Sequence, residues 1–195
     1  MAGSDATVAG VDEAGRGPLA GPVVAAAVVL ARGGRWKGLN DSKQVEAELR
    51  EELYARVLIE ARAFSWCVIG PRAIDTMNIR RASLEAMRRS VLGLGAPPTL
   101  VLVDGLDVVP GLACEPRAVV DGDARMLSIA AASIVAKVVR DRIMTRLDRV
   151  WPAYGFARHK GYATPEHLAA IEAHGPCPCH RYSFSPVCVQ SLALG

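Results

Sequence analysis

The sequence lacks any apolar run of the ~18 residues that a membrane-spanning helix requires, and its N-terminal stretch shows no basic segment followed by a hydrophobic one. Internal repeats and low-complexity linkers are also missing. Cysteine occurs five times, an odd number at irregular spacing, which argues against a disulfide framework and favours reduced thiols. These absences predict a cytoplasmic protein that makes no contact with a membrane.

The composition is that of an ordinary globular domain. Of the 195 residues, 51% are hydrophobic, which supplies a sizeable core, and 22% are charged. The formal net charge of +3 is only mildly basic, so any surface for nucleic acid has to be local. We expect a monomer with one domain over residues 1–195, comprising a sheet core and helices to about residue 150 and a helical C-terminal portion over about residues 151–195.

Two adjacent carboxylates near the start of the chain carry the first chemical signal. Asp12 and Glu13 interrupt an apolar, strand-like run, and the turn Gly15-Arg16-Gly17 follows at once. Burying the two carboxylates costs several kcal/mol per ion unless a positive charge meets them, and Mg²⁺ and Mn²⁺ prefer such oxygen ligands. Glycines let backbone amides approach a ligand closely, with a cation beside them. Together these residues indicate phosphodiester chemistry.

Apolar runs bounded by glycine and proline predict the strands of the domain. The run over residues 100–103 is apolar at every position, as expected of a strand covered on both faces. Strands are expected over residues 7–13, 22–30, 63–69, 99–104 and 117–120.

Capping signals and helical spacing of apolar residues predict the helices. Asp41 or Ser42 can cap a helix that runs to about residue 62, and Asp75 can cap one that runs to about residue 94. A long helix is expected over residues 127–150, and another begins at Pro165. Early strands followed by mixed strands and helices indicate an α/β fold with a helical C-terminal region.

Further carboxylates are candidates for the same metal cluster. Asp104 ends the apolar strand, where α/β sheets place functional groups, although an Asp-Gly pair also forms ordinary turns. Asp121 or Asp123 can supply a fourth carboxylate, and the sequence does not separate them. Asp141, between two arginines, is interpreted as part of a solvated helix face. Two ions ~3.5–4 Å apart in such a cluster would clamp both reacting oxygens of a phosphoryl displacement.

A segment near residue 160 interleaves basic and aromatic side chains. Residues 158–162 contain Arg, His, Lys and Tyr162, with Tyr154 and Phe156 just upstream. Such a segment can hold phosphates and stack on a sugar or base, and the alternative is a polar loop with aromatic residues in the core. Three more residues are weaker candidates for phosphate contact: Lys43, Ser133 and Lys137.

Three other patterns in the sequence have interpretations that are less specific than the motifs they match. Gly15-x-Gly17-x-x-Ala20 matches a relaxed dinucleotide fingerprint, but that fingerprint has to open a helix, and a turn and a strand are predicted here. Cys177-Pro178-Cys179-His180 resembles half of a zinc site without a second pair, so reduced thiols in a loop are favoured. Residues 190–194 resemble a sliding-clamp-binding peptide that lacks its usual aromatic residue.

Six motifs follow one another in a specific order. They are AGVDEAGRGP (residues 9–18), NDSK (40–43), VDG (103–105), GD (122–123), ASIVAK (132–137), and YGF (154–156) with HKGY (159–162). In this order, and over nearly the whole chain, they resemble the type 2 ribonuclease H (ribonuclease HII) family. The related type 3 enzymes carry lysine in the glycine turn and an extra N-terminal domain, so Arg16 and the short N-terminal stretch fit type 2.

This resemblance implies a ribonuclease-H-like mixed five-stranded sheet flanked by helices, and Mn²⁺- or Mg²⁺-dependent cleavage of RNA in RNA–DNA hybrids. It also implies incision of duplex DNA on the 5′ side of an embedded ribonucleotide, which leaves 3′-hydroxyl and 5′-phosphate ends. The catalytic and metal-binding carboxylates implied are Asp12, Glu13, Asp104 and Asp123, so the resemblance selects Asp123 over Asp121.

The resemblance also assigns contacts with the nucleic acid. The turn Gly15-Arg16-Gly17 is implied to read the ribose 2′-hydroxyl, and Tyr162 to stack on the sugar. Lys43, Ser133 and Lys137 match positions in the family motifs. Two rivals stay open: a DNA-cleaving nuclease of the same fold, such as a junction resolvase, and a hybrid-binding module without catalysis.

Overall fold

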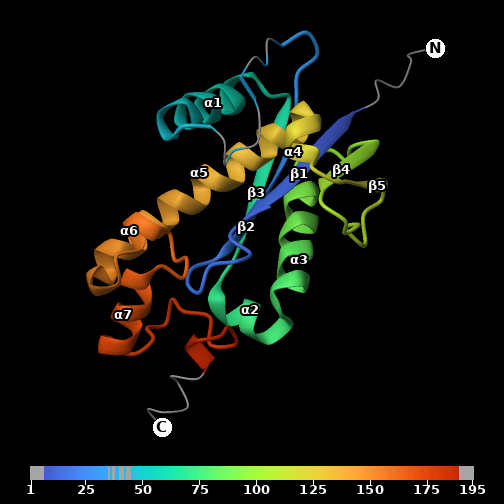
Figure 1. The fold of residues 1–195 in the computed structure, drawn as a ribbon. Coiled ribbons are helices and arrows are strands. Elements are labelled where there is room, and N and C mark those ends of the chain that lie inside the picture. The colour runs from blue at the N-terminus through green and yellow to red at the C-terminus, as the bar shows by residue number, and fades with distance from the viewer. Residues whose placement is uncertain (1–6, 35, 37, 40–41, 43–44, 189–195) are drawn as a thin grey trace, which may run out of the picture.

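The computed structural model describes residues 7–34, 36, 38–39, 42 and 45–188. Its centre is a five-stranded sheet in the order β3-β2-β1-β4-β5 (Figure 1). β1 pairs antiparallel with β2 and parallel with β4, β2 pairs antiparallel with β3, and β4 pairs parallel with β5. The predicted mixed α/β sheet is therefore confirmed. The strands are β1 (Val8–Ala14), β2 (Val23–Val29), β3 (Ala63–Ile69), β4 (Leu100–Asp104) and β5 (Glu115–Val119).

Helices connect these strands and continue beyond the sheet. The long helix α5 packs against β1 and β2, while α3 packs against β1, β2 and β3. Among the described residues, no helix is both long and apolar enough to span a membrane. The helices are α1 (Ala47–Glu60), α2 (Pro71–Met77), α3 (Ile79–Leu92), α4 (Gly122–Arg125), α5 (Leu127–Val150), the 3₁₀ helix η1 (Pro152–Tyr154), α6 (Phe156–His159) and α7 (Pro165–His174).

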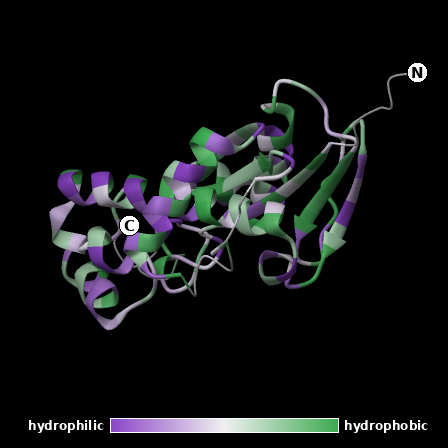
Figure 2. Cartoon of the chain, turned by 90° about the horizontal axis from the view of Figure 1, so that it is seen from above, coloured by the Kyte–Doolittle hydropathy of each residue, from purple (hydrophilic) through white to green (hydrophobic). Residues whose placement is uncertain are grey.

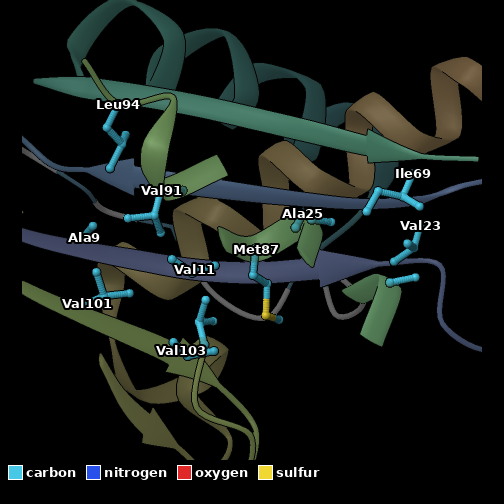
Figure 3. Packing of buried hydrophobic residues seen from close by; sticks show 14 of the residues in the cluster. Ala9, Val11, Val23, Ala25, Ile69, Met87, Val91, Leu94, Val101 and Val103 are labelled. Carbon is cyan, nitrogen blue, oxygen red and sulfur yellow. The ribbon is translucent and has the colours of Figure 1, made fainter. Parts of the chain in front are cut away.

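The core lies on both faces of the sheet, because successive side chains of a strand point to opposite faces. On one face Val11 and Val103 pack with Met87 of α3 (Figure 3). On the other face Ala26 and Val28 of β2 pack with residues of α1 and α5. β2 is buried along its whole length, as its uninterrupted apolar run requires. In Figure 2 the strands at the centre are coloured mainly hydrophobic, and many hydrophilic residues lie on the helices of the C-terminal region.

Two helix predictions need correction. α1 begins at Ala47, and the buried Ser42 points its hydroxyl at Ser133 (Oγ to Oγ, 2.8 Å) and caps no helix. Asp41 lies outside the described residues. The helix expected from Asp75 to about residue 94 is two helices, because Asn78 has a positive φ of 67° that ends the first and its side chain caps the second. Asp75 lies inside α2, which begins at Pro71 with Gly70 as its N-cap residue, so Asp75 caps no helix.

The C-terminal segment closes back onto the N-terminal one. Residues 19–21 form an antiparallel bridge with residues 179–181, through Ala20 and His180. The Arg181 N–H donates to the Leu19 carbonyl at 2.8 Å, and the Gly21 N–H donates to the Cys179 carbonyl at 2.8 Å. This pairing places residues 179–181 against the loop that connects β1 to β2.

Candidate active site

Three aspartates from separate elements converge at one edge of the sheet. Asp12 lies on β1, Asp104 ends the parallel neighbour β4, and Asp123 lies in α4. The register that pairs Val11 with Val103 sets Asp12 beside Asp104. One carboxylate oxygen from each of the three lies within 4.8 Å of the others.

The electrostatics of this cluster favour a bound cation. Burial raises the pKa of Asp12 well above its ordinary value, and the charges of Glu13 and Asp104 raise it further. A hydrogen bond from the Ser133 side chain opposes that rise. Asp12 and Asp123 are only 5% and 8% exposed, so neighbouring water screens their repulsion poorly. Buried carboxylate oxygens of this kind fit Mg²⁺ or Mn²⁺.

The loop before α4 determines which of its two aspartates joins the cluster. Asp104 Oδ1 accepts hydrogen bonds from the backbone N–H groups of Gly122 at 2.8 Å and Asp123 at 3.4 Å. Asp121 has a positive φ of 52°, is exposed, and precedes the helix as its N-cap residue. The fold thus brings Asp123, and not Asp121, to Asp12 and Asp104.

Glu13 faces a small cavity beside the aspartates. The cavity has a volume of about 230 Å³, and its lining includes Glu13, the turn Gly15-Arg16-Gly17 and Tyr162. Arg16 Nη1 donates to Glu13 Oε1 at 3.3 Å. Burial raises the pKa of Glu13, and Arg16 lowers it. Glu13 therefore lies at the junction between the acidic cluster and the glycine turn.

Most of the predicted nucleic-acid contacts line this same cavity. Tyr162 is 47% exposed, and its Cε1 lies 3.7 Å from the position that a Cβ on Gly17 would take. Ser133 is buried and bonded to Ser42, while Lys137 Nζ pairs with Asp141 Oδ1 at 2.9 Å. Asp141 is therefore the ion-pair partner of a lysine that lines the cavity, whereas the sequence predicted only a solvated helix face. Lys43 lies outside the described residues.

Two upstream aromatic residues of the basic-aromatic segment belong to the core. The rings of Tyr154 and Phe156 stack with centroids 5.4 Å apart, and both side chains are buried. The Tyr154 hydroxyl donates to the Gly175 carbonyl at 2.8 Å. The alternative of core aromatics is correct for this pair, because the cluster under α7 needs large apolar side chains.

The segment that resembles half of a zinc site makes internal hydrogen bonds. His180 Nδ1 accepts from the Cys177 N–H at 2.9 Å, and His180 Nε2 lies 3.0 Å from His167 Nε2. All five cysteines are described, and none of them forms a disulfide with another. Sequence reasoning missed Arg140 and Arg181, two buried arginines behind the glycine turn. No local sequence pattern marks them, because their guanidinium groups donate to backbone carbonyls that are distant in the chain.

Comparison with known proteins agrees with this geometry. The family model described as Ribonuclease HII matches residues 9–187. A Ribonuclease HII of Agrobacterium fabrum is 58% identical over 180 residues, which cover 92% of this chain and 82% of that protein. The crystal structure of ribonuclease H2 from Pyrococcus horikoshii OT3 is similar with a TM-score of 0.81 and 28% identity, over 96% of this chain and 98% of that one.

A further solved structure is that of the PCNA:RNase HII complex from Archaeoglobus fulgidus. Its matching chain has a TM-score of 0.79 and 28% identity, over 92% of this chain and 95% of that one. The family match and the sequence identity extend over the strands, helices and carboxylates described above. This chain therefore belongs to the ribonuclease HII family, and is a metal-dependent endoribonuclease that degrades the RNA strand of RNA–DNA hybrids.

Proposed function

We propose that this enzyme also incises duplex DNA on the 5′ side of a single embedded ribonucleotide, leaving 3′-hydroxyl and 5′-phosphate ends. The observation that carries the proposal is that a candidate metal site and a candidate ribose site lie side by side. The acidic cluster of Asp12, Asp104 and Asp123 adjoins a cavity lined by the glycine turn and Tyr162. A nuclease for one ribonucleotide needs a metal site and a ribose-reading site within one nucleotide of each other.

Asp12, Glu13, Asp104 and Asp123 are the proposed metal ligands and catalytic residues. A pair of Mn²⁺ or Mg²⁺ ions bound there would activate the attacking water and stabilise the negative charge on the leaving oxygen. Ser133 holds the Asp12 carboxylate through its hydrogen bond. Arg16 does the same for Glu13, and the bonds from Gly122 and Asp123 fix the Asp104 carboxylate. These partners keep the acidic side chains in place before any ion binds.

Recognition of the ribose is proposed for the glycine turn and Tyr162, which line the same cavity. The backbone amides of the turn Gly15-Arg16-Gly17 donate to the 2′-hydroxyl, which is the group that distinguishes RNA from DNA. Tyr162 presents its half-exposed ring next to Gly17, where it stacks on the sugar. Lys137, held by Asp141, and Ser133 line the same cavity and face the phosphates, and Lys43 is proposed to join them.

The deciding experiment compares three duplexes of one sequence: all-DNA, DNA with one internal ribonucleotide, and an RNA–DNA hybrid. With Mn²⁺ or Mg²⁺ we expect cleavage of the second and third, and none of the first. Extension of the product by a DNA polymerase reports the 3′-hydroxyl. Cleavage of the all-DNA duplex would support the junction-resolvase alternative. Binding without cleavage would support a hybrid-binding module, and cleavage in excess EDTA would refute the metal mechanism.

A contact with a sliding clamp through residues 190–194 is a second proposal. These residues lie outside the described part of the chain. The support is the PCNA complex of the Archaeoglobus fulgidus ribonuclease HII, which is 28% identical to this chain. Surface plasmon resonance tests this contact with the sliding clamp of the organism that this chain comes from. The binding of the full chain is compared with that of a chain ending at Cys188. Equal responses from both chains would refute the contact.

A further inference from the structure

Arg181 is a fully buried arginine whose hydrogen bonds all go to backbone carbonyls. Its side chain is 0% exposed. Nη2 donates to the Gly15 carbonyl at 2.6 Å, Nη1 to the Arg16 carbonyl at 2.9 Å, and Nε to the Gly21 carbonyl at 3.0 Å. The guanidinium thus contacts both carbonyls within the glycine turn and a third just beyond it.

Burial of this cation is costly to the folded state. Burial lowers the pKa of Arg181 to about 9, which is the direction expected for a cation removed from water. The guanidinium also lies over the ring of Phe184, with its central carbon 5.0 Å from the ring centroid. An apolar side chain of similar volume would fill such a site without the loss of hydration. The arginine therefore calls for an explanation other than packing.

The planarity of the peptide bond supplies that explanation. In a trans peptide the C=O and the N–H of the same unit point in opposite directions. The Gly15 carbonyl shares its unit with the Arg16 N–H, and the Arg16 carbonyl shares its unit with the Gly17 N–H. Because the Arg181 guanidinium binds both carbonyls, both N–H groups point away from it, and the residues that carry them line the cavity.

Both amides are available to a ligand. Within the part of the chain that the structure describes, neither the Arg16 N–H nor the Gly17 N–H donates to a protein acceptor. The positive φ of Gly15, 99°, allows the backbone to reverse at this point. Two neighbouring donors directed into a cavity form a ready site for one oxygen atom.

The position of Arg181 is itself fixed from both sides. Its own N–H donates to the Leu19 carbonyl in the bridge to residues 19–21. On the other side Asp75 of α2 accepts hydrogen bonds from the Tyr182 N–H at 3.0 Å and the Ser183 N–H at 2.9 Å. The backbone around Arg181 is therefore held by Leu19 and by Asp75 of α2, neither of which belongs to the acidic cluster.

We propose that Arg181 is a positioning residue for ribose recognition, which aims the amides of Arg16 and Gly17 at the 2′-oxygen of the substrate. This inference rests on the proposed role of the glycine turn. It assigns discrimination between RNA and DNA to a side chain that never touches the nucleic acid. It also gives the C-terminal segment a function in specificity, since that segment supplies the guanidinium.

The experiment measures the preference for a ribonucleotide separately from metal binding. Dissociation constants are measured in Ca²⁺ for two duplexes that differ only by one 2′-hydroxyl, and Mn²⁺ affinity is measured by calorimetry. In Arg181→Met we expect the preference for the ribonucleotide to fall about tenfold, since two ordinary hydrogen bonds are misdirected. Mn²⁺ affinity should stay unchanged. Arg181→Lys should fall between, because its ammonium keeps the charge but lacks the planar fork whose Nε, Nη1 and Nη2 reach three separate carbonyls.

Tyr182→Phe is the matched control. Tyr182 is the next residue, is 41% exposed, and donates its hydroxyl to the Pro176 carbonyl. The Tyr182→Phe variant should keep both the preference for the ribonucleotide and the Mn²⁺ affinity. A folded Arg181→Met with the full preference would overturn the inference, as would a parallel loss of Mn²⁺ affinity. If Arg181→Met does not fold, Arg181→Lys decides by the same ratio. Absence of any preference in the unsubstituted enzyme would instead refute the proposed function.

Discussion

Gly10 of β1 lies against the backbone of Ser128 in α5 so closely that a Cβ on Gly10 would be 2.1 Å from the Ser128 carbonyl carbon. No side chain separates the strand from the helix at this point. The close approach lets α5 run along the sheet, and Ser133, further along the helix, reaches the Asp12 carboxylate. The glycine thus sets how closely α5, which carries Ser133, approaches β1, which carries Asp12.

We expect Gly10→Ala to destabilise the protein by about 1–3 kcal/mol or more, because the methyl group meets backbone atoms that cannot rotate away. Urea unfolding measures the change. Gly70→Ala is the matched control, since nothing lies within 4 Å of its added Cβ and its φ is −77°. Equal unfolding free energies for Gly10→Ala and Gly70→Ala would contradict this account of the strand–helix contact.

Asp12→Asn should abolish cleavage while raising thermal stability in EDTA. The substitution keeps the shape of the side chain but removes a buried charge whose pKa burial already raises. Mn²⁺ should raise the melting temperature of the unsubstituted protein by mass action and leave that of Asp12→Asn almost unchanged. Asp121→Asn, an exposed neighbour of the cluster, should behave like the unsubstituted protein. Near-normal turnover by Asp12→Asn at saturating Mn²⁺ would disprove the assignment.

Tyr162→Ala should reduce incision at a single ribonucleotide by roughly tenfold to a hundredfold, because stacking contributes ~1–3 kcal/mol per contact. Tyr162→Phe should lose much less, and long hybrids should be less affected because they offer many backbone contacts. The melting temperature should hold, since the ring is 47% exposed. Tyr182→Ala removes a ring of similar exposure, 41%, and serves as the control. Equal losses on both substrates with a lower melting temperature would make Tyr162 a structural residue.

The titration of His180 should contribute to the pH dependence of the free energy of unfolding. Its Nδ1 accepts from the Cys177 N–H, so its Nε2 carries the proton and donates to His167 Nε2, while His167 Nδ1 donates to the Tyr162 carbonyl at 2.8 Å. This series of hydrogen bonds requires the imidazole rings of both His180 and His167 to be neutral. Burial, and then the nearby His167, lowers the pKa of His180 from 6.5 to about 4.

Because the folded pKa is the lower one, the unfolded chain binds the proton more readily, and stability present above pH ~6.5 is lost as pH falls toward 4. Urea unfolding from pH 7.5 to 4.5 measures that loss. His180→Asn keeps an acceptor for the Cys177 N–H without a titrating group, so its unfolding free energy should depend less on pH in this range. An unchanged dependence would show that His180 is not the group responsible.

Much of the sheet was readable in the sequence. Apolar runs predicted five strands to within two residues, because a strand buried on both faces such as β2 leaves no room for polar residues. Asp12 within β1 and Asp104 at the end of β4 stood out for the same reason, since a carboxylate in a buried strand is costly without a partner. Pro165 after Thr164 marked the start of α7, where the Thr164 hydroxyl caps the helix.

The sequence by itself thus determined where apolar strands run and where carboxylates interrupt them, because burial acts on each residue through its own hydration. Only the tertiary structure decided which residues meet. It brought Asp123 to the cluster through hydrogen bonds to Asp104, and it buried Tyr154 and Phe156 beneath α7. It also placed Arg181 behind a turn that lies more than 160 positions earlier in the chain. Such contacts depend on how elements pack, and no local pattern of residues encodes that packing.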